Sequence, residues 1–207
     1  MKKIAIVNYG VGNLQSVYNA FSAVGGTAKI IDSPKDIKAF DMIVLPGVGA
    51  FGDGMKNLTT MGWKEALEKE VQVKKKPFIG FCLGMQLLAT TGYEHGVFQG
   101  LGWVAGTVDK MVSNDSDVRI PHIGWNNVRF IKKNGIYNNI GDEQSFYFVH
   151  SYILNPTDKN VISGICSHGA DFVASIEIDN ISATQFHPEK SHKAGLTVIK
   201  NFIEKYS

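Results

Sequence analysis

Apolar residues recur along the first half of the chain in two alternating patterns. Short runs in which nearly every residue is apolar predict strands that are buried on both faces. Stretches with apolar residues three or four positions apart predict helices with one buried face. The expected strands are residues 4–7, 28–31, 42–45 and 78–81, and the expected helices are residues 14–24, 63–73 and 83–89. Strands that alternate with helices predict right-handed crossover units and a parallel sheet covered on both faces.

The second half of the chain has a different pattern. Short strand candidates separated by turn residues lie at 104–108, 145–149, 161–165, 172–178 and 181–185. They predict an antiparallel extension of the parallel sheet. A closing helix is expected over residues 194–205, where Leu196, Ile199 and Phe202 recur at helical spacing. The predicted fold class is therefore α/β, with a mostly parallel, flavodoxin-like central sheet flanked by helices, in one domain over residues 1–207.

Composition narrows the class of protein. Of the 207 residues, 44% are apolar and 19% are charged, which is typical of a globular chain and argues against intrinsic disorder. The formal net charge is +2, and arginine is rare, so we expect no nucleic-acid partner. No run approaches 18 apolar residues, so we expect no membrane-spanning helix.

The first residues and the cysteines together indicate the cellular compartment in which the chain is expected. The apolar run at residues 4–7 is short and no small-residue cleavage site follows it, so it is interpreted as a first strand rather than a signal peptide. Cys82 and Cys166 are the two cysteines and lie far apart in the sequence. Two thiols without an export signal are typical of the reducing cytoplasm, which is the expected location.

The strongest chemical signal is the segment Gly80-Phe-Cys82-Leu-Gly84, between an expected strand and an expected helix. It fits a strand, sharp turn and helix that present a nucleophile, with glycines where neighbouring backbones come close. A thiol at the start of a helix is favoured as thiolate. The alternative is that Cys82 is a buried structural cysteine, which is common.

A second signal follows the last expected strand, in Gln185-Phe-His187-Pro-Glu189. A carboxylate beside an imidazole fixes its tautomer and stabilises the imidazolium. An isolated His-Pro-Glu is more often a surface turn. Together with Cys82, however, it gives the Cys–His–Glu combination used for acyl transfer.

A third segment is rich in glycine and covers residues 46–54, Pro-Gly-Val-Gly-Ala-Phe-Gly-Asp-Gly. It follows an expected parallel strand, at the end where α/β proteins bind ligands. Its backbone N–H groups could point at a developing oxyanion. The alternative is an ordinary flexible loop. A phosphate-binding loop is excluded because no Gly-Lys-Ser/Thr follows.

Metal binding is not expected. Cys166 and His168 are close in sequence, but the chain has no C-x-x-C pair. We interpret Cys166 as part of a buried strand. His122, His150 and His192 are each interpreted as structural or solvated, and no cofactor is expected.

Taken together, these segments resemble the triad-type, class I glutamine amidotransferases. The matching segments are residues 46–55, 80–86, 121–126 (Pro-His-Ile-Gly-Trp-Asn), 150–152 (His-Ser-Tyr) and 185–190. They span nearly the whole chain. The cysteine turn and His-Pro-Glu are typical of the whole family. Residues 46–49 and 121–126 point to its members that supply ammonia in histidine biosynthesis.

The resemblance implies a role for each matching residue. Cys82 would be the nucleophile that attacks glutamine, His187 the general acid and base, and Glu189 the group that orients His187. The implied oxyanion hole consists of Gly47, Val48, Gly49 and the N–H of Leu83. The implied glutamine-binding residues are Gln86, Glu94, Ser151 and Tyr152, and the implied partner-facing residues are Asn13 and Trp125.

The resemblance also implies a partner. This would be a (βα)8-barrel cyclase subunit that forms a heterodimer with the chain, receives its ammonia and sets the oxyanion loop. Three alternatives stay open at this point. The same chemistry could supply another acceptor, such as a surface sugar; the chain could be a stand-alone cysteine hydrolase of the γ-glutamyl hydrolase kind; or it could be a non-enzymatic binding module, although the intact Cys82, His187 and Glu189 argue against that.

Overall fold

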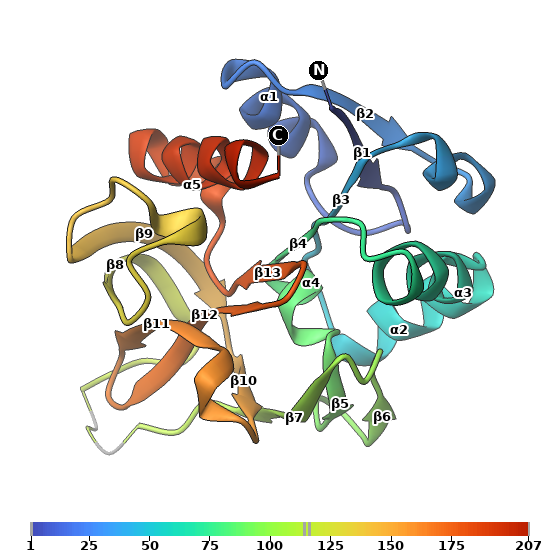
Figure 1. Cartoon of the computed structure of the whole chain (residues 1–207). Helices are drawn as coiled ribbons and strands as arrows, with labels where there is room; N and C mark the ends of the chain where they lie inside the picture. Colours follow the sequence, from blue (N-terminus) through green and yellow to red (C-terminus); the bar gives the residue numbers. More distant parts are fainter. Residues whose placement is uncertain (1, 114, 116, 207) are drawn as a thin grey trace.

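A nine-stranded sheet runs through the centre of the computed structural model, which describes residues 2–113, 115 and 117–206 (Figure 1). The order across it is β2 (Thr27–Ile31), β1 (Lys3–Val7), β3 (Met42–Leu45), β4 (Phe78–Phe81), β13 (Ile181–Thr184), β12 (Asp171–Ile178), β11 (Ile162–Ser167), β8 (His122–Phe130) and β9 (Glu143–His150). Strands from β2 to β13 pair in parallel, and those from β13 to β9 pair antiparallel. The predicted α/β fold with an antiparallel extension is confirmed.

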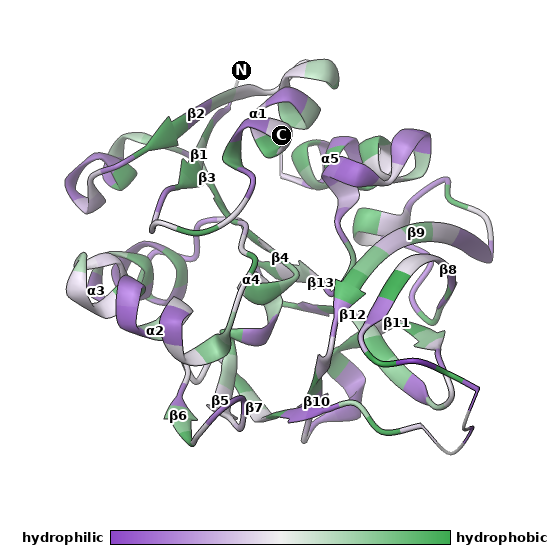
Figure 2. Ribbon diagram, turned by 180° about the vertical axis from the view of Figure 1, so that it is seen from behind, coloured by the Kyte–Doolittle hydropathy of each residue, from purple (hydrophilic) through white to green (hydrophobic). Residues whose placement is uncertain are grey.

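The helices cover both faces of the parallel strands. Helices α1 (Leu14–Ala23) and α5 (His192–Lys205) lie on one face, and α2 (Phe51–Thr60) and α3 (Trp63–Leu67) lie on the other (Figure 1). In β1, Ile4 and Ile6 join the apolar cluster under α1 and α5, while Ala5 and Val7 join the cluster under α2 and α3. Figure 2 shows these central strands as hydrophobic and the outer sides of the helices as more polar. Burial on both faces explains why the strands have no polar alternation.

Helix α1 buries Val17 and Phe21, whereas Tyr18 is 37% exposed. Two helix predictions need correction. The stretch at 63–73 is helical throughout, but α3 gives way to a π-helix, η2 (Glu68–Val73). The helix expected at 83–89 ends early: α4 covers Leu83–Gln86. The chain then enters a strand, because Ala89 pairs with Val104.

Helix α2 was not predicted, because glycines made its first turns look like a loop. Phe51, Met55 and Leu58 are buried at helical spacing, and this is the signal that the glycines obscured. Gly54 allows close packing, since a Cβ there would lie 3.1 Å from the Leu83 side chain. The helix therefore packs closely on α4, and the glycine-rich loop proper is confined to residues 46–50.

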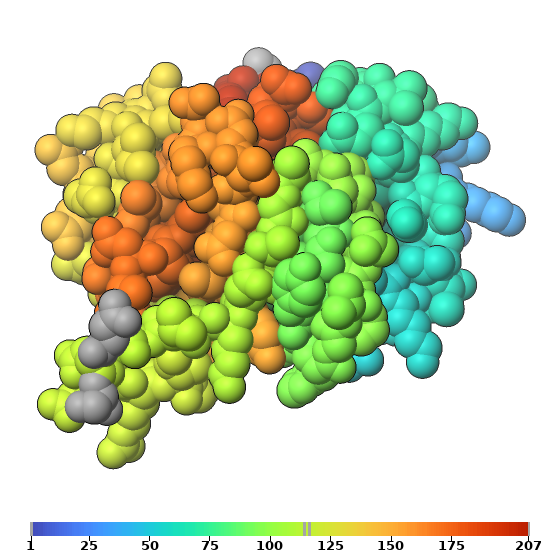
Figure 3. All heavy atoms as spheres, turned by 90° about the horizontal axis from the view of Figure 1, so that it is seen from below, coloured from blue at the N-terminus to red at the C-terminus, as the bar shows by residue number. Residues whose placement is uncertain are grey.

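A second sheet of four strands lies at the bottom of the view in Figure 1. Its order is β10 (Tyr152–Pro156), β7 (Val104–Lys110), β5 (Ala89–Gly92) and β6 (Phe98–Gln99). Figure 3 shows the segment near residue 155 against the segment near residue 105, in agreement with the β10–β7 pairing. Short 3-10 helices complete the fold: η1 (Pro34–Ala39), η3 (Gly135–Tyr137), η4 (Lys159–Val161) and η5 (Pro188–Lys190). Among the described residues no helix is long and apolar enough to cross a bilayer.

Candidate active site

Cys82 lies at the sharp turn between β4 and α4. Its φ of 50° and ψ of −105° lie outside the regions that L-residues prefer. The two flanking glycines are required by close approach: a Cβ on Gly80 would lie 2.6 Å from the Gly84 carbonyl oxygen, and one on Gly84 would lie 1.9 Å from that of Leu45. The Cys82 N–H donates to the Thr184 carbonyl at 2.7 Å. The turn is thus held tightly between neighbouring strands, and backbone strain of this kind clusters at functional sites.

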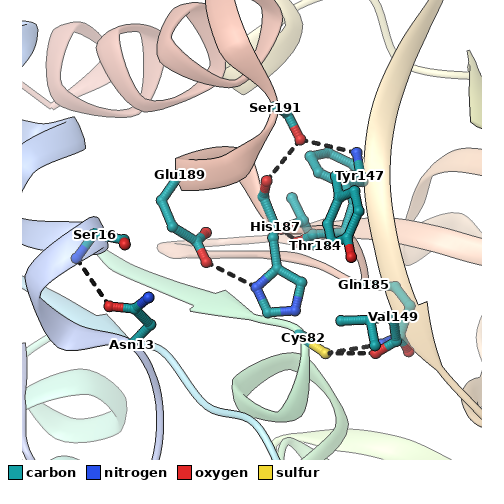
Figure 4. Close-up of polar contacts among 11 residues, drawn as sticks. Asn13, Ser16, Cys82, Tyr147, Val149, Thr184, Gln185, His187, Glu189 and Ser191 are labelled. Carbon is teal, nitrogen blue, oxygen red and sulfur yellow. Dashed lines mark hydrogen bonds and ion pairs between the residues drawn. The ribbon is translucent and has the colours of Figure 1, made fainter. Parts of the chain in front are cut away.

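His187 and Glu189 form a buried pair beside Cys82. The Nδ1 of His187 lies 2.8 Å from Oε1 of Glu189, and both side chains are 3% exposed. The opposite nitrogen, Nε2, has no hydrogen-bond partner among the described residues and points toward the Cys82 sulfur (Figure 4). Backbone contacts fix the turn, because the His187 N–H donates to Tyr147 and its carbonyl accepts from Ser191 Oγ. The ring is therefore oriented as a base or acid toward Cys82.

The charge state of His187 follows from its surroundings. Burial alone would lower the pKa of this histidine, but the Cys82 sulfur and the Glu189 carboxylate raise it to about 10. The imidazolium is consequently the form present at neutral pH. An imidazolium beside the Cys82 sulfur can deliver a proton to a leaving group, and the neutral imidazole that results can later take a proton from water.

The predicted glutamine-binding residues lie around one cavity of about 340 Å³. Its walls include Val48, Gly49, Cys82, Gln86, Glu94, Ser151 and Tyr152. The structure adds Val149, His150 and Lys190 to this wall, which the sequence interpretation missed. Lys190 directly follows the His-Pro-Glu motif, and that adjacency was the available signal. Gln185 also contacts the site, with its Nε2 3.6 Å from the Cys82 sulfur.

Gln86 and Glu94 are held in place by hydrogen bonds. Gln86 Nε2 donates to the Tyr152 carbonyl at 2.8 Å and to Gln185 Oε1 at 3.1 Å. The Glu94 carboxylate accepts from the Phe51 N–H at 2.8 Å. Because Phe51 begins α2, Glu94 links the cavity wall to the helix that follows the glycine-rich loop.

The expected oxyanion hole is not open in this structure. The Leu83 N–H, which the resemblance assigns to the oxyanion, donates to the Gly47 carbonyl at 3.3 Å. Gly49 has a φ of +115°, which favours glycine. The Leu83 N–H, which is one of the expected oxyanion donors, is therefore already bound to the loop beside Cys82.

Asn13 and Trp125, the predicted partner-facing residues, have different surroundings. Asn13 caps α1, because its side-chain oxygen accepts from the Ser16 N–H at 3.2 Å. Trp125 is 48% exposed and stacks on His192, with ring centroids 4.9 Å apart. Trp125 thus presents an exposed aromatic ring, whereas the Asn13 side chain already has a structural role.

Three other histidines, His122, His150 and His168, lie close together. His122 Nδ1 lies 3.1 Å from His150 Nε2, and the rings of His122 and His168 stack at 4.0 Å. Cys166 is buried in β11, and burial raises the pKa of its thiol to about 12. No cluster of three or more His, Cys, Asp or Glu in the described part of the chain could hold a metal ion.

Comparison with known proteins gives consistent matches. The model of the family "Glutamine amidotransferase class-I" matches residues 5–206. The imidazole glycerol phosphate synthase subunit HisH 1 of Campylobacter jejuni (strain RM1221) is 46% identical over 200 residues, covering 97% of this chain and 98% of that protein. The subunit HisH of Geobacter sulfurreducens is 43% identical over 208 residues, with 99% of each chain covered. Among solved structures, PurLQS from Thermotoga maritima superposes with a TM-score of 0.76 at 16% identity, over 100% of both chains.

Proposed function

Because the chain belongs to the class I glutamine amidotransferases, we propose that it is the glutaminase subunit of imidazole glycerol phosphate synthase. It hydrolyses glutamine to glutamate and ammonia and passes the ammonia to a cyclase subunit. The observation that carries the proposal is the buried His187–Glu189 pair facing Cys82, beside a cavity of a size suited to one amino acid.

The first half of the reaction forms a thioester. The Cys82 thiolate attacks the side-chain amide carbon of glutamine, and the C=O electron pair moves onto oxygen. The His187 imidazolium then gives its Nε2 proton to the amide nitrogen. The C–N bond breaks, ammonia leaves and a glutamyl thioester remains on Cys82.

The second half releases glutamate. Neutral His187 accepts a proton from water, and the resulting hydroxide attacks the thioester carbon. The C–S bond breaks, and Cys82 leaves as a thiolate beside the imidazolium that has just formed. Glu189 keeps Nδ1 protonated in both halves, so that Nε2 is always the nitrogen that exchanges the proton.

Groups around the cavity hold the substrate and the charge that develops. Gln86, Glu94, Ser151 and Tyr152 bind glutamine. The backbone of Gly47, Val48, Gly49 and Leu83 stabilises the oxyanion. Loss of one oxyanion donor commonly costs about 10²–10³ in rate, so the Leu83–Gly47 hydrogen bond predicts slow turnover until the loop is rearranged.

The ammonia acceptor is the partner subunit. We propose a (βα)8-barrel cyclase that forms a heterodimer with this chain in the cytoplasm. It converts the phosphoribulosyl formimino ribonucleotide PRFAR to imidazole glycerol phosphate and the ribonucleotide AICAR in histidine biosynthesis. Asn13 and Trp125 face this partner.

The test measures glutamate release by the purified chain alone, with the cyclase, and with cyclase plus its ribonucleotide substrate. We expect an increase of orders of magnitude only in the last mixture. Cys82→Ala should abolish release, whereas Cys166→Ala, which removes the thiol in β11, should leave it near wild type. Vigorous turnover by the chain alone would indicate an independent hydrolase. Turnover by Cys82→Ala would refute the mechanism.

A further inference from the structure

Tyr9 lies beneath the glycine-rich loop with its hydroxyl buried. The residue directly follows Asn8 after β1, and its side chain is fully buried in the cluster that also contains Leu45 and Leu83. Its hydroxyl oxygen has no hydrogen-bond partner among the described residues. A buried hydroxyl without a partner is costly, so its presence requires an explanation.

The hydroxyl lies directly against Gly47. A Cβ built on Gly47 would lie 2.2 Å from the Tyr9 oxygen, so only glycine fits there and the hydroxyl contacts the loop backbone. The segment that carries Tyr9 is anchored, because the Asn8 carbonyl accepts from Trp63 Nε1 at 2.9 Å. Gly12 meets the same loop residue, since a Cβ on it would lie 3.5 Å from the Gly47 Cα. Residues 9–12 thus form a fixed support for Gly47.

Tyr9 stays neutral and keeps a proton to donate. Burial, and then the nearby charge of Cys82, raises the pKa of its phenol far above the ordinary value. The proton therefore stays on the oxygen throughout the accessible pH range. A fixed O–H donor packed against Gly47 is a suitable partner for the carbonyl of that residue when the loop rearranges.

The loop needs such a donor when the oxyanion forms. In this structure the Gly47 carbonyl accepts from the Leu83 N–H at 3.3 Å. If the Leu83 N–H turns to the oxyanion, the Gly47 carbonyl loses its donor. A carbonyl left unpaired inside the protein opposes that rearrangement.

We propose that Tyr9 is a positioning residue for the oxyanion loop, whose hydroxyl donates to the Gly47 carbonyl when the Leu83 N–H turns to the oxyanion. In the resting chain the Tyr9 hydroxyl has no hydrogen-bond partner among the described residues, and in the active chain the Gly47 carbonyl would lose its donor. The exchange pairs these two groups with each other. The inference rests on the proposed glutaminase function. It assigns Tyr9 no contact with substrate.

Tyr9→Phe removes the hydroxyl and keeps the ring. In the complex with cyclase and ribonucleotide, we expect kcat for glutamate release to fall about three- to tenfold with KM for glutamine unchanged, because the lost bond forms only with the oxyanion. The midpoint of urea unfolding should stay the same or rise, because the resting chain loses an unpartnered hydroxyl. If the hydroxyl made a merely structural hydrogen bond, its removal would lower that midpoint.

The matched control is Tyr137→Phe, which removes the hydroxyl of another fully buried tyrosine, in η3. A second readout uses the aldehyde analogue of glutamine, in which the amide is replaced by –CHO. The Cys82 sulfur adds to its carbonyl carbon, the C=O π bond opens onto oxygen, and the proton of the thiol–imidazole pair balances the charge. The adduct places an oxygen in the oxyanion hole. Tyr9→Phe should weaken its binding by the same factor as kcat, and leave the affinity for glutamate unchanged.

The outcomes separate the two claims. If the wild-type complex releases no glutamate, the proposed function fails and the inference falls with it. If the wild type is active and Tyr9→Phe matches Tyr137→Phe and wild type in kcat and aldehyde affinity, only the inference is refuted. A parallel loss of unfolding midpoint and kcat in Tyr9→Phe, with equal weakening of glutamate and aldehyde, would also refute it, because it would show a structural role.

Discussion

Two cysteines of the same chain show how surroundings decide reactivity. Cys82 has a backbone φ of 50° and lies beside the buried His187–Glu189 pair. Cys166 sits in the ladder of β11, where burial raises the pKa of its thiol. Cys82 therefore has a partner for proton transfer, whereas burial in an apolar strand keeps the Cys166 thiol protonated and inert. The contrast supports Cys82 as the nucleophile on physical grounds that do not depend on any motif.

His122 and His150 make folding stability depend on pH. Burial, followed by the charge of His168, lowers the pKa of His122 to about 4. Burial, followed by the charge of His122, lowers the pKa of His150 to about 3. In the unfolded chain each pKa is about 6.5, so below that pH the unfolded state binds protons that the folded state does not. We expect the contribution of these two histidines to the free energy of unfolding to be fully retained above pH 6.5 and to decrease as the pH falls toward 4.

The slope should reach at most about 1.4 kcal/mol per pH unit for each histidine. Urea unfolding of wild type and His122→Asn between pH 7 and 4.5 measures it, and the variant should lose up to half of the slope. The control His95→Asn removes an exposed histidine and should keep the wild-type slope. Equal slopes for wild type and His122→Asn would contradict the prediction.

At the level of elements, the sequence predicts what is encoded locally. The strands of the parallel sheet and the cysteine turn are short contiguous patterns, and the structure contains both. Helix α2 was missed because Gly52 and Gly54 are poor helix formers, and the contacts that require them, such as Leu83 against Gly54, lie far along the chain. Likewise, the Leu83–Gly47 hydrogen bond joins two segments, so no local pattern announces it.

The cysteine turn yields a prediction about packing between elements. Because a Cβ on Gly84 would lie 1.9 Å from the Leu45 carbonyl oxygen, Gly84→Ala must push α4 away from β3. We expect a loss of at least about 1–3 kcal/mol in the free energy of unfolding, and lower glutaminase activity, since Leu83 and Cys82 move with the helix. Thermal unfolding and glutamate release measure the two effects.

The matched control for Gly84→Ala is Gly141→Ala, in the loop between η3 and β9. The nearest atom to a Cβ there is 3.8 Å away, so this variant should unfold and turn over like wild type. If Gly84→Ala behaves in the same way, the close approach of α4 to β3 does not hold the site.

In the molecule as a whole, the site forms where three parallel strands end. Gly47 follows β3, Cys82 follows β4, and His187 follows the turn after β13. These strands are neighbours in the sheet, so residues more than a hundred positions apart in sequence meet at one edge. The sequence predicts this edge, but the closing of the cavity by Val149 and His150 of β9 depends on where the antiparallel extension packs. That long-range packing leaves no periodic pattern in the sequence from which it could be predicted.

The same extension presents apolar residues to solvent. On β8, Ile123 is 61% exposed and Trp125 is 48% exposed, and their spacing of two places them on one face. The Trp125 ring is held by stacking on His192, in the first turn of α5. An exposed aromatic that is already ordered is suited to a protein interface, because little side-chain freedom is lost on binding. His192 follows closely after the catalytic turn, which connects this surface with the site.

Trp125→Ala should therefore weaken association with the cyclase. We expect its Kd, measured by isothermal titration calorimetry, to rise at least about tenfold, as is typical when a central tryptophan is truncated. The control Val73→Ala alters an apolar side chain that is more exposed than Trp125, 73% exposed at the end of η2, and should leave the Kd unchanged. If both variants bind the cyclase like wild type, the face of β8 that carries Trp125 is not the docking surface. A rise in Kd for Trp125→Ala alone would place the partner beside α5 and the His187 turn. From there the partner could contact the loop at Val48, which is itself partly exposed, and so set the oxyanion hole.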